Sequence, residues 1–383
     1  MAVARPAQRA AAPIPYGRQS IDDDDIAAVV EALRSDWLTT GPRVEEFESA
    51  LAASAGSREA VAVSSGTAAL HAALHALGIG PGDEVVVPTL TFAATANAVL
   101  YTGATPVFAD VDSETLLIDP AAAAAAIRPS TAAVIAVDYA GQPSEYGVLR
   151  ALCDRHGLAL VADACHSLGG DLDGRPVGSL ADASCFSFHP VKHVTTAEGG
   201  AVTTDDAETA ARLRRFRNHG ITTDHRERAR TGSWAYEQIE LGFNYRLSDL
   251  QCALGTSQLR RLPGWIARRR ALAARYDELL EPVEGVTPLA LRGGAGHAYH
   301  LYVVQLDGDR DAVFAELRAA GIGANVHYVP VHLHPYYRER LGTGPGLCPV
   351  AEDAFSRILS LPLFPALTDG DVARVVDELA RAV

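Results

Sequence analysis

From about Val61 onward, short apolar runs rich in β-branched residues alternate with alanine- and leucine-rich segments of helical period. The runs are "AVAVSSG" before "TAALHAALHAL", "DEVVVP" before "FAATANAVLY", and then "TPVFADV", "AAVIAVDYA" and "LALVADAC". This alternation predicts an α/β fold in which a mostly parallel central sheet is covered by helices. Ligands of such folds bind at the carboxyl ends of the strands. The residues that follow each run are therefore the first candidates for a site.

The second half of the chain changes its pattern. The segment "SFHPVKHVTTAEGGAVTTDD" is typical of strand, loop and strand, and a helix is expected after it at roughly 206–218. A long helical stretch follows, which we expect to be interrupted near Pro263 and to connect two lobes. The later runs "HAYHLYVVQL", "RDAVFAELRAAG" and "IGANVHYVPVH" indicate a smaller α+β lobe.

These patterns predict a flexible tail at 1–13, a large domain at 14–260 and a small C-terminal domain at 261–383. A helix is expected at 22–35, packed either with the large domain or on the small lobe. It begins with four aspartates, which suit the positive end of a helix dipole.

Composition and charge narrow the class of protein. The 383 residues are 48% hydrophobic, which is enough for a large buried core. A net charge of −14 without a basic stripe argues against a nucleic-acid surface. No apolar run reaches membrane-spanning length, and "MAVARPAQRAAAP" lacks the apolar core of a signal peptide. The five cysteines are scattered and form no CxxC pair, so we expect a reducing, cytoplasmic location and no metal site.

Lys192 is the only lysine among 33 basic Lys and Arg residues. An arginine side chain stays protonated, whereas a lysine amine can lose its proton and act as a nucleophile. Composition alone does not decide between a lysine that is retained by chance, with a solvated ammonium group, and a catalytic lysine. The neighbouring motifs must decide between them.

Several modest signals follow successive strands. "SSGTAAL" places Gly66 and Thr67 at a helix start, where an anion can bind, although an ordinary helix cap has the same pattern. "VADACHS" ends a strand with Asp163 and places His166 three residues later. Asp163 either caps a helix beside a hydrogen-bonded His166, or is a buried carboxylate that needs a cationic partner. Phe92 begins a helix, as a core residue or as a platform for a flat ring.

Together with Lys192, and Ser187 five residues before it, these signals describe one ligand, pyridoxal 5′-phosphate. The amine of Lys192 would bond to the aldehyde of this cofactor. An acidic partner would keep the pyridine nitrogen protonated, so that the ring can accept electrons.

Five segments also resemble the DegT/DnrJ/StrS nucleotide-sugar aminotransferases of PLP fold type I. They are "SSGTAAL", "ADACHSLG", "FSFHPVKHVTTAEGGAVTT", "LGFNYRLSDLQCALG" and "GIGANVHYVPVH", and they stand in the family's order and spacing. The likeness runs from about Pro15 to the C-terminus. It implies the aspartate aminotransferase-like fold and a homodimer with shared active sites.

The resemblance also implies roles for individual residues. Lys192 would be the Schiff-base lysine and proton carrier, Asp163 would pair with the pyridine nitrogen, and His166 would lie near the 3-hydroxyl group. Phe92 would stack on the ring. The phosphate would be held by Gly66, Thr67 and Ser187, and by Asn244 of the neighbouring subunit. The sugar-nucleotide site would be lined by Tyr16, Trp37, Thr39, His327 and Tyr328.

Within the family, "YGRQSIDDDDIAAVV", "SDWLTTGP" and "NYRLSDLQCALGTSQL" are most similar to the aminotransferase of pseudaminic acid synthesis. This likeness implies a product of the type UDP-4-amino-4,6-dideoxy-N-acetyl-β-L-altrosamine, with L-glutamate as amino donor. The alternatives are another nucleotide keto-sugar, a keto-cyclitol, a PLP-dependent sugar dehydratase and a non-catalytic sensor. Dehydratases of the family carry histidine in place of the lysine, whereas here His193 only follows Lys192, so transamination is favoured and His193 is expected to be a loop residue.

Overall fold

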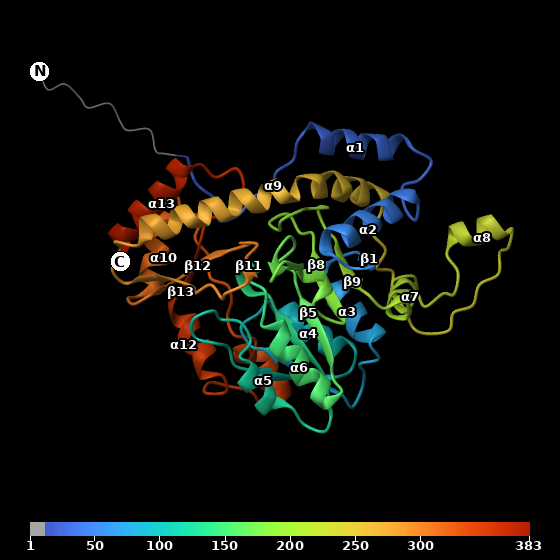
Figure 1. Ribbon diagram of the computed structural model, residues 1–383, viewed down its shortest axis with the longest axis horizontal. Helices are drawn as coiled ribbons and strands as arrows, with labels where there is room; N and C mark the ends of the chain where they lie inside the picture. The colour runs from blue at the N-terminus through green and yellow to red at the C-terminus, as the bar shows by residue number, and fades with distance from the viewer. Residues whose placement is uncertain (1–11) are drawn as a thin grey trace, which may run out of the picture.

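The computed structural model describes residues 12–383, and its centre is a seven-stranded sheet with helices on both faces (Figure 1). The strand order is β1-β9-β8-β5-β4-β2-β3. These strands are β1 (Glu59–Val63), β2 (Glu84–Pro88), β3 (Thr105–Ala109), β4 (Thr131–Val137), β5 (Ala159–Asp163), β8 (Ala183–Ser187) and β9 (Gly200–Thr204). From β8 to β3 each neighbouring pair is parallel, while β9 is antiparallel to both β1 and β8. The predicted α/β fold with a mostly parallel sheet is confirmed.

Each strand buries side chains on both faces because successive residues point to opposite sides. In β1, Val61 and Val63 belong to one apolar core and Ala60 and Ala62 to the other. The first core is covered by α3 (Gly66–Ala76), α4 (Ala93–Tyr101) and α7 (Ala207–Phe216). The second is covered by α2 (Pro42–Ala55), α5 (Pro120–Ala126), α6 (Tyr146–His156) and the first half of α9 (Asp249–Leu280).

The expected interruption near Pro263 is wrong, because α9 runs without a break through that residue. A proline inside a helix costs about 3 kcal/mol. Here buried side chains on both sides of it, Leu262 and Ile266, pack into the core of the large domain. The helix also packs against α2, against α1 (Asp23–Arg34) and, further along, against α13 (Asp369–Ala382). The predicted boundary at 260/261 therefore falls inside one continuous helix.

The smaller lobe is built on the three-stranded antiparallel sheet β10-β12-β13. Its core joins this sheet to the second half of α9, to α13 and to Ile14 near the chain start, which pairs with Ile322. The remaining elements are β6 (Asp171–Leu172), β7 (Arg175–Pro176), α8 (His225–Thr231), β10 (Val286–Pro288), β11 (Ala295–Gly296), β12 (Tyr302–Leu306), α10 (Arg310–Ala319), α11 (Pro335–Leu341), α12 (Pro349–Arg357) and β13 (Ile358–Leu361). Of the described helices, none combines the length and the apolar character needed to cross a bilayer.

The predicted N-terminal helix is α1 (Asp23–Arg34), which lies along α9 (Figure 1). Asp22 and Asp25 form a capping box, so the aspartates do serve the helix start. They also form ion pairs with Arg261 of α9, and the buried Asp25 accepts a hydrogen bond from Gln258 (2.6 Å). The predicted tail at 1–13 lies, except for its last two residues, outside the described residues.

Candidate active site

A cavity of about 480 Å³ lies at the carboxyl ends of β1, β2, β5 and β8. Because these strands run in the same direction, the residues that follow them meet at one edge of the sheet. Segments from the smaller lobe close the other side of the cavity. The predicted site residues that line it are Tyr16, Gly66, Thr67, Phe92, Asp163, His166, Ser187, Lys192, His327 and Tyr328.

One end of the cavity is formed by the N-terminus of α3 against the end of β8. Ser65 caps the helix by accepting a hydrogen bond from the Ala68 amide (3.0 Å). A Cβ atom on Gly66 would lie 2.8 Å from the Cβ of Ser187 and 3.2 Å from its Oγ. Glycine therefore allows the first-turn N–H groups to lie beside the Ser187 hydroxyl. With the hydroxyl of Thr67 nearby, this end of the cavity suits an anion such as a phosphate group.

Asp163 ends β5 and is only 6% exposed. One carboxylate oxygen accepts a hydrogen bond from the hydroxyl of Thr95 (2.7 Å), and the other accepts one from the amide of Cys165 (3.3 Å). Both donors are neutral. A buried carboxylate gains most from a cationic partner, and a ligand with a protonated ring nitrogen would supply one.

His166 lies between Asp163 and the smaller lobe. Its Nε2 is 3.0 Å from the hydroxyl oxygen of Tyr328, and its ring centroid is 4.4 Å from that of His300. Its Nδ1 is buried and has no hydrogen-bond partner within residues 12–383. Burial holds the pKa of His166 well below its ordinary value, and the charge of Lys192 lowers this pKa further. His166 is thus a neutral ring that lines the cavity and is held through Nε2 by Tyr328.

Lys192 lies in the loop between β8 and β9, at the tight turn where its amide donates to the carbonyl oxygen of His189 (2.9 Å). Its Nζ is 3.4 Å from Nε2 of His300. Burial lowers the pKa of Lys192, and the nearby carboxylate of Asp163 offsets part of this effect. A lowered pKa increases the fraction of free amine, which is the form that attacks an aldehyde.

Aromatic and imidazole side chains form the remaining wall. Phe92 caps α4 and is 60% exposed, with its ring centroid 5.8 Å from that of Tyr328. An exposed ring at the wall of a cavity is available for stacking on a flat ligand. The ring of His327 lies 5.6 Å from that of Tyr16, and its Nδ1 is 2.8 Å from the hydroxyl oxygen of Ser360. Burial lowers the pKa of His327 to about 4, so this ring is neutral.

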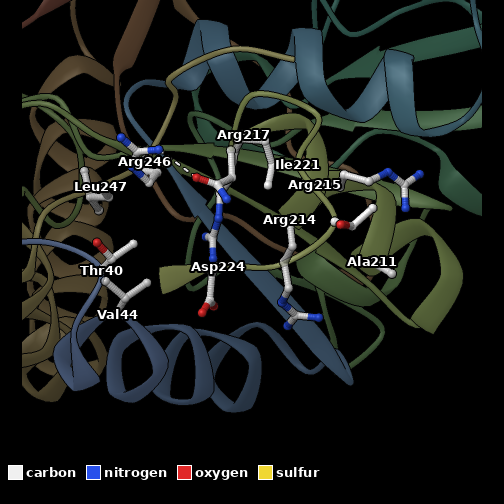
Figure 2. A pocket seen from close by; sticks show the side chains of 12 residues that line it. Thr40, Val44, Ala211, Arg214, Arg215, Arg217, Ile221, Asp224, Arg246 and Leu247 are labelled. Carbon is white, nitrogen blue, oxygen red and sulfur yellow. Dashed lines mark hydrogen bonds between the residues drawn. The ribbon is translucent and has the colours of Figure 1, made fainter. Parts of the chain in front are cut away.

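Three predicted residues, Trp37, Thr39 and Asn244, do not line this cavity. Thr39 pairs with Ser248 at the start of α9, and Asn244 is exposed and pairs with Asn218. Asn218 belongs to a second hollow of about 360 Å³, which is shown in Figure 2. Its lining includes Thr40, Arg214, Arg215, Arg217 and Arg246. Arg246 donates to Oδ1 of Asn218 (2.7 Å), which is the dashed contact in Figure 2.

Sequence reasoning did not find Thr95 and His300. Thr95 follows Phe92 by one helical turn, so its place beside Asp163 depends on how α4 packs against β5. His300 comes from the segment before β12, more than a hundred residues after Lys192. A signal existed only for Thr95, since a threonine in the first turn of a helix after a strand end faces the same edge of the sheet. His193 is buried and bonds to the carbonyl oxygen of Ala298 (3.0 Å).

The chemistry of these groups fits pyridoxal 5′-phosphate. An anion cradle lies at one end of the cavity, a buried carboxylate and a free amine lie further in, and an exposed aromatic ring lies on the wall. Comparison with known proteins agrees: residues 19–380 match the model of the DegT/DnrJ/EryC1/StrS aminotransferase family, and the chain belongs to this family. It is a PLP-dependent sugar aminotransferase of fold type I.

Individual relatives support the same class. SpsC, a spore coat polysaccharide biosynthesis protein of Bacillus subtilis, is 42% identical over 377 residues, which is 97% of either chain. Spr1654 of Streptococcus pneumoniae, described as a sugar aminotransferase and solved in its PMP form, gives a TM-score of 0.92 at 33% identity, over 96% of this chain and 98% of that chain. PseC of Helicobacter pylori, an aminotransferase involved in pseudaminic acid biosynthesis, gives a TM-score of 0.90 at 33% identity, over 97% and 99% of the two chains.

Proposed function

We propose that the protein transfers the amino group of L-glutamate to the C4 keto group of a UDP-linked 4-keto-6-deoxy-N-acetylhexosamine. The product would be an amino sugar of the pseudaminic acid type. The observation that carries the aminotransferase part is the meeting of Lys192, Asp163 and the anion cradle in one cavity. The choice of sugar is supported by likeness to PseC along almost the whole chain.

Each side chain has a role in this proposal. Bound pyridoxal 5′-phosphate supplies an aldehyde that takes up an amino group and a ring that accepts electrons. Lys192 would attach to it, and its free amine would hold and deliver a proton at Nζ. Asp163 would keep the pyridine nitrogen protonated, and His166 would bond to the 3-hydroxyl. Phe92 would stack on the ring, and Gly66, Thr67 and Ser187 would hold the phosphate.

Two unlike substrates must use this cavity in turn, because glutamate delivers the amino group and the sugar removes it. Tyr16, His327 and Tyr328 line the same cavity as the anion cradle, and in this proposal they bind the sugar. The neutral ring of His327 and the hydroxyl of Tyr328 would bind sugar oxygens by hydrogen bonds rather than by charge.

A homodimer completes the proposal. The exposed large apolar residues Trp234 (87%), Leu241 (76%), Ile239 (58%) and Tyr236 (56%) lie on the segment that projects from the body around α8 (Figure 1). Large exposed apolar side chains gathered on one segment are typical of an interaction surface. Asn244 follows this segment directly. A second copy covering it would bring Asn244, Thr39 and Trp37 to the partner's cavity, and we place this dimer in the cytoplasm.

Two separate half-reactions test the substrate. The absorbance of the bound cofactor shows whether L-glutamate converts the pyridoxal form to the pyridoxamine form. The return of the pyridoxal absorbance then shows whether a keto substrate has accepted the amino group. We expect return with the UDP-linked 4-keto sugar, and little or none with a dTDP-linked 4-keto sugar or a keto-cyclitol. If a competitor restores the pyridoxal form and the UDP-linked sugar does not, the proposed substrate is wrong but the protein is still an aminotransferase. Failure of glutamate and other amino donors in the first step would contradict transamination itself.

The role of Lys192 has its own test, which is simple because the chain has one lysine. Borohydride reduction of the holoenzyme should attach the cofactor to the peptide that contains Lys192. Lys192→Arg keeps the charge without a free amine, so it should take no label. Label on another peptide, or a wild-type visible band in Lys192→Arg, would refute the assignment.

A further inference from the structure

The amine of Lys192 meets one side chain that neither the motifs nor the proposed function accounts for. Within residues 12–383, the hydrogen-bond partner of Nζ is Nε2 of His300, at 3.4 Å. His300 is 5% exposed and stands between Lys192 and His166, whose ring centroid is 4.4 Å away. It lines the same cavity as both.

The backbone around His300 is held unusually firmly. The amide of Leu301 donates to the carbonyl oxygen of Ala140 (3.0 Å). The fully buried Arg269 of α9 donates from Nη1 to the carbonyl oxygens of Tyr299 (3.0 Å) and Leu363 (3.0 Å). Gly141 permits this close approach, since a Cβ there would lie 2.9 Å from the amide nitrogen of His300. The imidazole is therefore presented to Lys192 from a fixed base rather than from a loop that can swing away.

The protonation states of Lys192 and His300 follow from their burial and from which atoms can donate a hydrogen bond. Burial holds the pKa of His300 well below its ordinary value, and the charge of Lys192 acts in the same direction, so His300 is neutral. An ammonium group can only donate, so Nε2 must accept whenever Lys192 is charged. The proton of the ring then sits on Nδ1, which is buried and has no partner among the described residues. In that part of the chain, the contact with Lys192 is the one hydrogen bond of the His300 ring.

We propose that His300 is a positioning residue for Lys192, whose amine it holds through Nε2 whenever that amine is not bonded to the cofactor. The inference rests on the proposed role of Lys192. Without His300, the flexible lysine stem could turn toward the mouth of the cavity, away from Asp163 and the anion cradle. With it, the Nζ proton is shared with Nε2, and the amine stays beside the place where it must deliver that proton.

Other charged and titratable groups also face this pair and set the background for any titration. They are Asp163 at the end of β5, Cys165 and His166 just after it, His193 in the same loop as Lys192, Arg269 of α9 and His327 of the smaller lobe. Removing His300 leaves all of them in place. A change in the titration of Lys192 in a His300 variant is then assigned to the lost contact.

The single lysine makes a direct measurement practical. Full-length enzyme labelled with ¹³C at lysine Cε gives one side-chain signal, and the pyridoxamine phosphate form leaves the amine free to titrate. We expect the midpoint in His300→Phe to lie about one pH unit below the wild type, because the acceptor that favours the charged form is lost. His300→Gln places an amide oxygen near the position of Nε2 and should restore most of the difference. His193→Phe, which alters the neighbouring buried histidine, should not reproduce the drop.

Equal midpoints in wild type and His300→Phe, or equal midpoints in His300→Phe and His300→Gln, would overturn the proposal. If His300→Phe does not fold, His300→Asn replaces it, because its shorter amide also loses the contact. The rate of the glutamate half-reaction should shift its pH profile in parallel with the midpoint. Failure of the proposed function itself gives a different result: the lysine signal would then not change when pyridoxal phosphate binds.

Discussion

The contact between α3 and β8 gives the sharpest prediction, tested by Gly66→Ala. The added Cβ would lie 2.8 Å from the Cβ of Ser187, whereas ordinary contacts begin at 3.4 Å, so the two elements must separate by about 0.6 Å. Ser187 ends a buried strand, and its Cβ cannot rotate away from the contact. Overpacking of this kind costs about 1 to 3 kcal/mol, and the better helix propensity of alanine offsets up to about 1 kcal/mol of it.

The larger effect should fall on the cofactor. A shift of this size moves the first-turn N–H groups of α3 away from Ser187, and the loss of one hydrogen bond to a charged phosphate costs about 1.5 to 3 kcal/mol. Since 1.4 kcal/mol is a factor of ten, the affinity for pyridoxal 5′-phosphate should fall roughly 10- to 100-fold. Titration of the cofactor-free chain, followed by visible absorbance, measures this affinity, and urea unfolding measures the stability.

Gly147→Ala is the matched control, because a Cβ at Gly147 of α6 meets nothing within 4 Å. That variant should gain up to about 1 kcal/mol of stability and bind the cofactor as the wild type does. Should Gly66→Ala bind pyridoxal phosphate as tightly as Gly147→Ala does, the phosphate is not held between α3 and Ser187. Unchanged stability together with unchanged affinity would refute the packing argument as well.

Three further results are expected. Thr95→Val should destabilise the cofactor-free chain by about 1 to 3 kcal/mol, because the hydroxyl that donates to the buried Asp163 is lost, whereas Thr95→Ser keeps this hydroxyl and should not. Urea unfolding measures both losses, and equal losses in the two variants would contradict this role of the hydroxyl. Mixing inactive Lys192→Ala with impaired Asn244→Ala chains should restore activity, since a hybrid dimer has one site free of both changes, and verified hybrids without activity would place Asn244 elsewhere. Burial lowers the folded-state pKa of His71 and of His327 to about 4, from an ordinary value of 6.5. The unfolded chain therefore takes up these protons first, so the stability contribution of the two neutral rings is present above pH 6.5 and is lost as the pH falls toward 4, by at most about 3 kcal/mol for each ring. A free energy of unfolding that stays constant from pH 7 to pH 5 would contradict this.

Most of the cavity could be predicted from the sequence, because its residues directly follow the strands that place them. Gly66, Asp163 and Ser187 each stand at or next to a strand end, so a local pattern and the rule for parallel sheets suffice. The continuity of α9 could not be predicted in this way. Local propensity marks Pro263 as a break, and only packing on both sides of the helix outweighs it.

Contacts between distant segments form a second group that sequence patterns miss. His300 reaches Lys192 because Arg269 and Gly141 fix the chain before β12, and neither residue carries a motif. Tyr328 was expected on the sugar side, yet it also hydrogen-bonds to His166. Tyr328→Phe should therefore disturb both half-reactions and not the sugar step alone.

The composition itself now has a physical explanation. Burial lowers the pKa of Arg269 only to about 10, so this guanidinium remains charged at neutral pH and serves backbone carbonyl groups. The same burial acts on Lys192 from a lower ordinary value, 10.5, and brings its amine closer to deprotonation. Arginine can thus replace lysine wherever a permanent charge is enough, as in the ion pairs of Arg261 with the start of α1. Arginine cannot replace a group that must lose a proton and form a bond, and this is the role proposed for Lys192, the single lysine of the sequence.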